Sequence, residues 1–249
     1  MIQNASEQYI IIERVEYMKY TIGLLALLGS ICLQISPVNM GMMNGGNEVK
    51  DWVSELEVDS GVKQMIVVSA NGSRANVSMH NKDANGEWKQ ILETEGYVGK
   101  NGIGKTKEGE AKTPVGIFHF TDAFGIKENP GCGMPYLQVD DSYYWVDDSQ
   151  SSYYNQFVTT KDVSWDWKSA EHIIGAGKVY NYVLALDYNS KCVPGLGSAI
   201  FLHCEAGKPT AGCVSVPEDI MVQIMQNVQE DCIILINSEE NFQKLIDKQ

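Results

Sequence analysis

Basic residues are scarce in this sequence, which has 19 Lys and Arg against 32 Asp and Glu and a formal net charge of −13. A nucleic-acid-binding protein needs a concentrated Lys/Arg face to neutralise phosphates, and no such cluster is present. Metal-binding spacings are missing too, because the 6 cysteines and 4 histidines form no CxxC or mixed Cys/His cluster of the zinc-binding kind. We therefore expect no nucleic-acid partner and no metal, and we interpret the acidity as a solvated surface.

No apolar run reaches the roughly 20 residues that a free-standing membrane helix requires. Residues 21–33 (TIGLLALLGSICL) follow Lys19 and have the length of a signal-peptide core. The acidic stretch 1–17 is wrong for a positive n-region, so we expect Met18 to be the natural start. Residues 18–36 are then a cleaved signal peptide or a retained anchor, with a buried cytosolic helix as a third alternative. Either of the first two places the protein outside the cytoplasm, secreted or anchored, with membrane contact only through this segment.

After a predicted linker at 37–61, short strand-like runs alternate with turn signals. Met65–Ser69 and Ala75–Met79 flank Asn71-Gly72, and Asn85-Gly86 precedes Trp88–Leu92. Strand, Asn-Gly, strand is the strongest short-range signal for a hairpin. Further strands are predicted at 116–120, 143–146, 180–186, 199–203 and 232–236, with a loop over 95–113.

One segment has a convincing helical pattern. Pro217 and two acids open it, and Ile220, Ile224 and Val228 recur at helical spacing, which predicts a helix over 217–229. Residues 238–249 are either a second short helix or a tail. Many short strands with one main helix indicate a mainly β domain over 62–237, a sandwich or a barrel.

Gly99–Thr106 satisfies the G-x-x-x-x-G-K-[ST] pattern of a phosphate-binding loop. That loop works only when a helix follows, because the amides at the helix N-terminus hold the phosphates. Gly109, Pro114 and Gly116 prevent a helix here, so a nucleotide-binding protein is only a remote alternative.

A histidine and a cysteine form the sharper candidate site. His203 closes the apolar run AIFLH, and Cys213 follows Gly212 ten residues later. A neighbouring imidazole can take the thiol proton and produce a strong nucleophile, while amides at Gly212-Cys213 could bind an oxyanion. Five cysteines remain after the predicted signal or anchor segment at 18–36, and an odd number leaves at least one thiol without a disulfide partner. On chemistry alone, a buried cysteine and a core histidine remain an equal alternative.

Several stretches resemble, in the same order, one branch of the L,D-transpeptidase (YkuD-like) family. They are GKNGIGKTKEGEAKTPVGIFHF, NPGCGMPY, YYWVDDSQSSYYNQFV, YVLALDYNS, VPGLGSAIFLH and PTAGCVSVPED, the last holding the family's [ST]-x-G-C segment. The resemblance covers about residues 62–236 and implies a β-sandwich of the family's own type, with the 217–229 helix beside the catalytic loop. It also explains Gly99–Thr106 as the loop ahead of a TP-x-G-x-F strand.

The resemblance implies roles for individual residues. Cys213 would be the nucleophile and His203 the general base, with the main-chain carbonyl of Cys204 orienting the imidazole. Ala211 stands where many members have a second histidine, and Ser215 where many have an Arg or Asn that anchors the donor. Substrate-binding positions are implied at Thr210, Ser215, Tyr154, Asn155, Tyr188 and Asn189. Whether the last four shape the cleft or pack beneath it is open.

The implied reaction is acyl transfer on peptidoglycan stem peptides, without a cofactor. Cys213 would release a terminal D-alanine, and the amine of a second stem would resolve the thioester into a 3→3 cross-link. Resolution by water (L,D-carboxypeptidase) or by a free D-amino acid (exchange) uses the same thioester and stays open. A non-catalytic wall-binding module would have no need of both Cys213 and His203. Carbapenem β-lactams are the expected inhibitors.

Overall fold

The computed structural model describes residues 53–54, 56 and 58–246. The expected segments 1–17 and 18–36 and most of the linker at 37–61 lie outside the described residues. Within the part of the chain that is described, no helix is long and apolar enough to cross a membrane.

The described chain is built mainly of β-strands, as the sequence predicts. The strands are β1 (Gln64–Asn71), β2 (Arg74–Lys82), β3 (Trp88–Tyr97), β4 (Gly116–Gly125), β5 (Tyr136–Gln138), β6 (Tyr143–Val146), β7 (Phe157–Thr159), β8 (Ala170–His172), β9 (Val183–Leu186), β10 (Phe201–Cys204), β11 (Val214–Val216) and β12 (Ile233–Ser238). The helices are the 3₁₀ segment η2 (Ile174–Tyr180) and the α-helices α2 (Glu218–Asn227) and α3 (Glu239–Ile246).

The larger sheet closes on itself. Its order is β12-β1-β2-β3-β11-β10-β9-β4, and β4 pairs again with β12, so these strands form a ring, to which β5 is added along β4. The ring is mixed, because β1–β12 and β10–β11 are parallel while the other ring pairs are antiparallel. Closure leaves the ring without open edges, which protects a β-rich protein from edge-to-edge aggregation.

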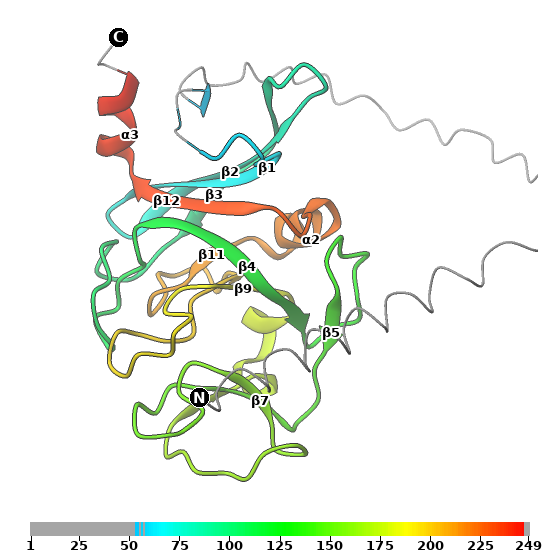
Figure 1. Cartoon of the computed structure of the whole chain (residues 1–249), viewed down its shortest axis with the longest axis vertical. Coiled ribbons are helices and arrows are strands. Elements are labelled where there is room, and N and C mark those ends of the chain that lie inside the picture. Colours follow the sequence, from blue (N-terminus) through cyan, green and yellow to red (C-terminus); the bar gives the residue numbers. More distant parts are fainter. Residues whose placement is uncertain (1–52, 55, 57, 247–249) are drawn as a thin grey trace, which may run out of the picture. The chain divides into compact units, whose positions relative to one another are not determined.

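Alternation along β10 and β11 gives the two faces of the ring different roles. Leu202, Cys204, Val214 and Val216 join one large apolar cluster, to which α2 also contributes buried side chains. His203 and Ser215, which lie between these residues along β10 and β11, point to the opposite face. Phe201 is on that face as well and belongs to a second apolar cluster. That cluster joins the ring to the small sheet β7-β6-β8, which Figure 1 shows beyond β9, away from β1 and β2. Successive side chains of a strand point to opposite faces, so His203 is directed toward the small sheet.

Most of the predicted elements are confirmed. The β1–β2 hairpin forms, although its register places the two turn residues at Gly72 and Ser73, one position later than Asn71-Gly72. Helix α2 begins after Pro217, and its Ile224 and the following Val228 are buried in the ring cluster. The C-terminal segment is helical as α3 up to Ile246.

Three predicted boundaries are wrong. The strand predicted at 116–120 continues to Gly125 as β4, because it stays paired with β9. The predicted strand at 180–186 begins only at Val183, because Tyr180 ends η2, where Gly177 takes a positive φ of 64°. The predicted loop at 95–113 begins later, since residues 95–97 continue β3 against β2. Three short strands (β5, β7 and β8) and β11 had no clear sequence pattern, because three-residue strands are too short to establish an alternation.

Candidate active site

Parallel pairing of β10 with β11 brings the two predicted catalytic residues into one cavity. His203 lies opposite Ser215 in the register, and Cys213 immediately precedes β11. The cavity has a volume of about 200 Å³. It is lined by Glu171, Val179, Tyr180, His203, Ala206, Lys208, Pro209, Thr210, Ala211, Cys213 and Ser215. The small sheet and η2 supply one wall, and the ring supplies the other.

The His203 imidazole is buried and held by the backbone. Its Nδ1 lies 2.7 Å from the carbonyl oxygen of Cys204, so the tautomer with the proton on Nδ1 donates to that carbonyl. The Tyr180 ring packs edge-on against it, with centroids 5.3 Å apart. Burial lowers the pKa of His203 to about 4, although hydrogen bonds to the backbone of Cys204 and Val179 act in the other direction. The imidazole is therefore neutral near pH 7 and can accept a proton.

The Cys213 thiol is also buried and protonated. Its Sγ donates to the carbonyl oxygen of Ala199 at 3.2 Å. Burial, together with the negative charge of Glu171, raises the pKa of the thiol. A thiol and a neutral imidazole thus share the cavity at rest. A nucleophile arises only when the proton moves from the thiol to a base as a bond forms.

The turn that carries Cys213 is fixed by two threonines. Thr210 Oγ1 donates to the Cys213 carbonyl at 2.7 Å, and Thr113 Oγ1 donates to the same oxygen at 3.2 Å. The Gly212 amide donates to Thr210 Oγ1 at 3.1 Å, so a substrate oxygen would have to compete with that hydroxyl for the amide. Gly212 has a φ of 155°, and a Cβ there would lie 3.0 Å from the Lys112 carbonyl oxygen. The Gly212 backbone therefore lies close against the Lys112 segment of its own chain.

Ser215 lines the cavity beside His203. The residue is almost fully buried, and its hydroxyl oxygen has no hydrogen-bond partner among the described residues. A buried hydroxyl without a partner is uncommon in native proteins. It leaves one polar group available for a bound molecule, where many family members carry a longer side chain.

Glu171 and Tyr180 are cavity residues that the sequence reasoning did not identify. Glu171 is the middle residue of β8, and its carboxylate accepts a hydrogen bond from the Tyr180 hydroxyl. Burial raises the pKa of the Glu171 carboxyl to about 7. No pattern in the sequence indicated either residue, because the cavity exists only when the small sheet packs on the ring.

Tyr154, Asn155, Tyr188 and Asn189 do not line this cavity. The hydroxyl of Tyr154 donates to Glu108, and that of Tyr188 donates to the Leu196 carbonyl. The amide groups of Asn155 and Asn189 bond mainly to the backbone around residues 188–199. These contacts support the segment that ends at Ala199, the hydrogen-bond acceptor for Cys213, and a role in substrate binding stays a prediction.

The Gly99–Thr106 loop lacks the surroundings of a phosphate-binding loop. No helix follows it before β4, as the glycines and proline predicted. Glu110 instead accepts hydrogen bonds from the amides of Thr106 and Lys107, and these bonds lower the pKa of its carboxyl to about 2. An acidic side chain thus occupies the amides that a phosphate would need.

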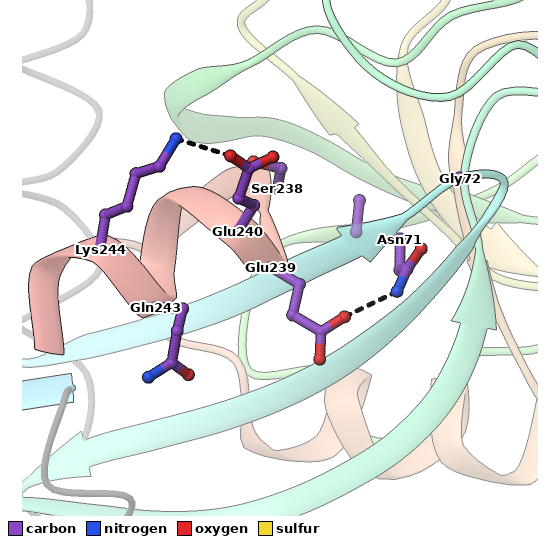
Figure 2. Close-up of a pocket in the computed structure, with 8 residues that line it drawn as sticks. Asn71, Gly72, Ser238, Glu239, Glu240, Gln243 and Lys244 are labelled. Carbon is purple, nitrogen blue, oxygen red and sulfur yellow. Dashed lines mark hydrogen bonds and ion pairs between the residues drawn. The ribbon is translucent and has the colours of Figure 1, made fainter. Parts of the chain in front are cut away.

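A larger hollow of about 660 Å³ lies between α3 and the β1–β2 turn (Figure 2). Its charged groups are paired with neighbours, since Asn71 donates to Glu239 at 2.8 Å and Lys244 pairs with Glu240. It contains no thiol and no imidazole. The five cysteines of the described residues are all free thiols, and no group of three metal-ligating side chains occurs among those residues. The chemistry therefore points to the Cys213 cavity.

Comparison with known proteins identifies the family of this chain. No curated protein sequence matches the chain. Among solved structures, a cysteine-to-serine mutant of an Enterococcus faecium L,D-transpeptidase matches with 15% identity and a TM-score of 0.35. The match covers 70% of this chain and 50% of that one, so this chain spans about half the length of that protein. The sequence model of the L,D-transpeptidase catalytic domain (YkuD) matches residues 63–236, and the chain therefore belongs to that family.

Proposed function

We propose that this protein is an exported peptidoglycan L,D-transpeptidase that uses Cys213 as nucleophile and His203 as general base. The observation that carries the proposal is the meeting of a buried thiol and a buried imidazole in one cavity of a chain of this family. The donor peptide would be bound by Thr210, Gly212 and Ser215.

Acylation begins when the donor carbonyl reaches Cys213. His203 takes the thiol proton while sulfur attacks the carbonyl carbon, and the tetrahedral oxyanion forms beside the amides of the 212–213 turn. The Gly212 amide exchanges Thr210 Oγ1 for this oxyanion. Collapse breaks the bond to the terminal D-alanine, whose nitrogen takes the proton from His203. A thioester on Cys213 and a free D-alanine remain.

The thioester is resolved by the side-chain amine of a second stem, which gives the 3→3 cross-link. The amine attacks the carbonyl, His203 accepts a proton from the attacking nitrogen, and the thiolate leaves and is reprotonated. Every proton transfer is assigned to a side chain of the protein, so the reaction as written uses no cofactor.

Mass spectrometry of products tests the reaction directly. The purified protein is incubated with disaccharide-tetrapeptide, and loss of D-alanine with formation of a dimer is expected. Tripeptide alone would indicate an L,D-carboxypeptidase, and incorporation of an added D-amino acid would indicate exchange. A carbapenem should add once to the protein, and Cys213→Ala should abolish the adduct. An adduct on Cys132, Cys192, Cys204 or Cys232 would contradict the assignment of the nucleophile.

The role of His203 is tested by the pH dependence of Cys213 alkylation. Loss of a general base typically costs 10²–10⁴-fold in rate, and we expect about that loss of acylation in His203→Ala. Ala211→His should change the rate of acylation little, because the native protein has no hydrogen-bonding side chain at that position. An unchanged alkylation profile in His203→Ala would show that another group activates the thiol.

Export is proposed from the apolar run 21–33 and Lys19. We expect the protein in the membrane or wall fraction, with initiation at Met18. Cytosolic protein that begins at Met1 would contradict this.

A further inference from the structure

Glu171 reaches the Cys213 cavity from the small sheet. It lies opposite Trp145 in the β6–β8 register, and its carboxyl meets the buried Tyr180 hydroxyl although part of the residue is exposed. It is the only carboxylate in the lining of this cavity.

The surroundings of this carboxylate contain no cation that pairs with it. The titratable and charged groups around it are Tyr180 from η2, His203 from β10, Cys213 before β11, Asp147 after β6, and the loop residues Lys105, Glu108 and Lys208. The buried Lys105 ammonium acts on Cys213 and pairs with Glu108 at 3.9 Å rather than with Glu171. Asp147 and Glu108 are acidic, and Lys208 is exposed. Among the described residues, no Lys, Arg or His forms an ion pair with Glu171.

Burying a carboxylate without a cation is unfavourable, and proteins rarely retain the arrangement without a reason. The Tyr180 hydroxyl supplies one hydrogen bond and leaves the other carboxylate positions unfilled. A cavity with this carboxylate beside a nucleophile is complementary to a molecule that brings a positive charge to the reacting atoms.

Resolution of the thioester requires such a molecule. An acceptor amine is an ammonium ion in water near neutral pH, and it must lose a proton before its nitrogen can attack. His203, whose pKa burial lowers to about 4, is a poor base for that proton. Glu171, whose carboxyl has its pKa raised to about 7 by burial, is the stronger base of the two.

We propose that Glu171 binds the ammonium group of the acyl acceptor and takes the proton that frees its nitrogen for attack. The inference rests on the proposed function and adds the group that selects a cationic acceptor. The ammonium gives one proton to the carboxylate, and the neutral amine forms the new C–N bond. His203 removes the second proton, the C–S bond breaks, and that proton returns to sulfur. Glu171 later releases its proton to water.

Separate measurement of acylation and transfer tests this role. Acylation is followed by carbapenem adduct formation, and transfer by dimer formation from disaccharide-tetrapeptide containing lysine or diaminopimelate. Glu171→Gln keeps the shape and can still accept the Tyr180 hydrogen bond. Removing the Glu171 charge also lowers the pKa of the Cys213 thiol, so the two rates are compared as a ratio, and we expect dimer formation to fall about 10²-fold relative to acylation. Glu205→Gln, an acid two residues beyond His203 and outside the lining, should match the native protein in both.

Two further readouts separate proton transfer from a structural effect. Hydroxylamine is already neutral near pH 7, so Glu171→Gln should retain transfer to hydroxylamine while losing transfer to the stem amine. The native rate of transfer should rise through about pH 7, and Tyr180→Phe should move that rise to higher pH, because the lost hydrogen bond had stabilised the carboxylate.

The outcomes are distinguishable. Equal losses of acylation and transfer in Glu171→Gln, or equal losses with hydroxylamine and the stem amine, would overturn the inference. So would native dimer formation in the variant. A native protein that forms no acyl-enzyme with carbapenem or tetrapeptide would instead overturn the proposed function, and this inference with it.

Discussion

Replacing Asn155 with alanine should separate support of the active site from substrate binding. The Asn155 side chain accepts hydrogen bonds from the Trp145 indole at 2.9 Å and the Ala199 amide at 3.1 Å. It also donates to the carbonyls of Tyr188 and Asn189 at 3.1 and 3.0 Å. The two donors are buried and would lose their acceptor, whereas the two carbonyls belong to partly exposed residues that water can reach.

The size of the effect follows from these contacts. An unsatisfied buried donor costs about 1–3 kcal/mol, so two of them cost about 2–6 kcal/mol before any water enters the space left behind. Asn155 also has a φ of 55°, where alanine is less favourable than asparagine by about 1 kcal/mol. We expect a net loss of about 3 kcal/mol, which for a domain of this size lowers the melting temperature by about 6–12 °C.

The catalytic consequence of Asn155→Ala passes through Ala199. The Ala199 amide bonds to Asn155, and its carbonyl accepts the Cys213 thiol. Loosening this segment should slow acylation by a carbapenem about tenfold, with little change in the concentration that gives half-maximal rate. Asn85→Ala, in an exposed turn, is the matched control and should change stability by less than about 0.5 kcal/mol. Weaker carbapenem or donor binding at unchanged stability would refute this reasoning and place Asn155 in the substrate site.

Three further predictions concern single residues. Burial lowers the pKa of His203 from 6.5 to about 4, so the unfolded chain binds protons more readily than the folded one. The free energy of unfolding should therefore fall by up to about 3 kcal/mol as pH decreases from about 6.5 to 4. Chemical denaturation of His203→Gln over this pH range should lack that part of the pH dependence. Gly212→Ala should slow carbapenem acylation at least tenfold, because the new Cβ strains the backbone and meets the Lys112 carbonyl; a native rate would contradict the tight turn. The Glu110 carboxylate, with a pKa lowered to about 2, should hold the Thr106 amide above about pH 4.5 and release it as pH falls through 2, which NMR titration of that amide measures; a midpoint at an ordinary glutamate value would exclude the bond.

The fold class could be predicted from the sequence because its signals are local. The apolar run of β1, the alternating run of β2 and the Asn71-Gly72 turn signal between them favour a hairpin. Pro217 and the two acidic residues after it likewise predict the start of α2. Short strands such as β8 carry no such signal, since three residues establish neither a period nor a boundary.

The candidate site likewise contains residues that could be predicted from the sequence and contacts that could not. Cys213 and His203 could be named from sequence because thiol and imidazole chemistry depends on residue type and spacing, and the ordered family stretches restricted the choice. The position of Ser215 beside His203 depends on parallel pairing of β10 with β11, which joins strands that are separated by a loop. Asn155 shows the opposite case, because its residue type was noticed but its hydrogen-bond partners come from other segments.

The sequence by itself determined the mainly β class, the helix after the cysteine, the family and the two residues proposed for the chemistry. Closure of the ring, the wall that η2 and the small sheet place over Cys213, and the presence of Glu171 in that wall were decided by the tertiary structure. The reason is that pKa values and hydrogen bonds depend on what lies within a few ångströms in space, and Glu171 and Cys213 are far apart along the chain. Residue type sets which chemistry is available, and packing sets which groups face the same cavity and in which protonation state.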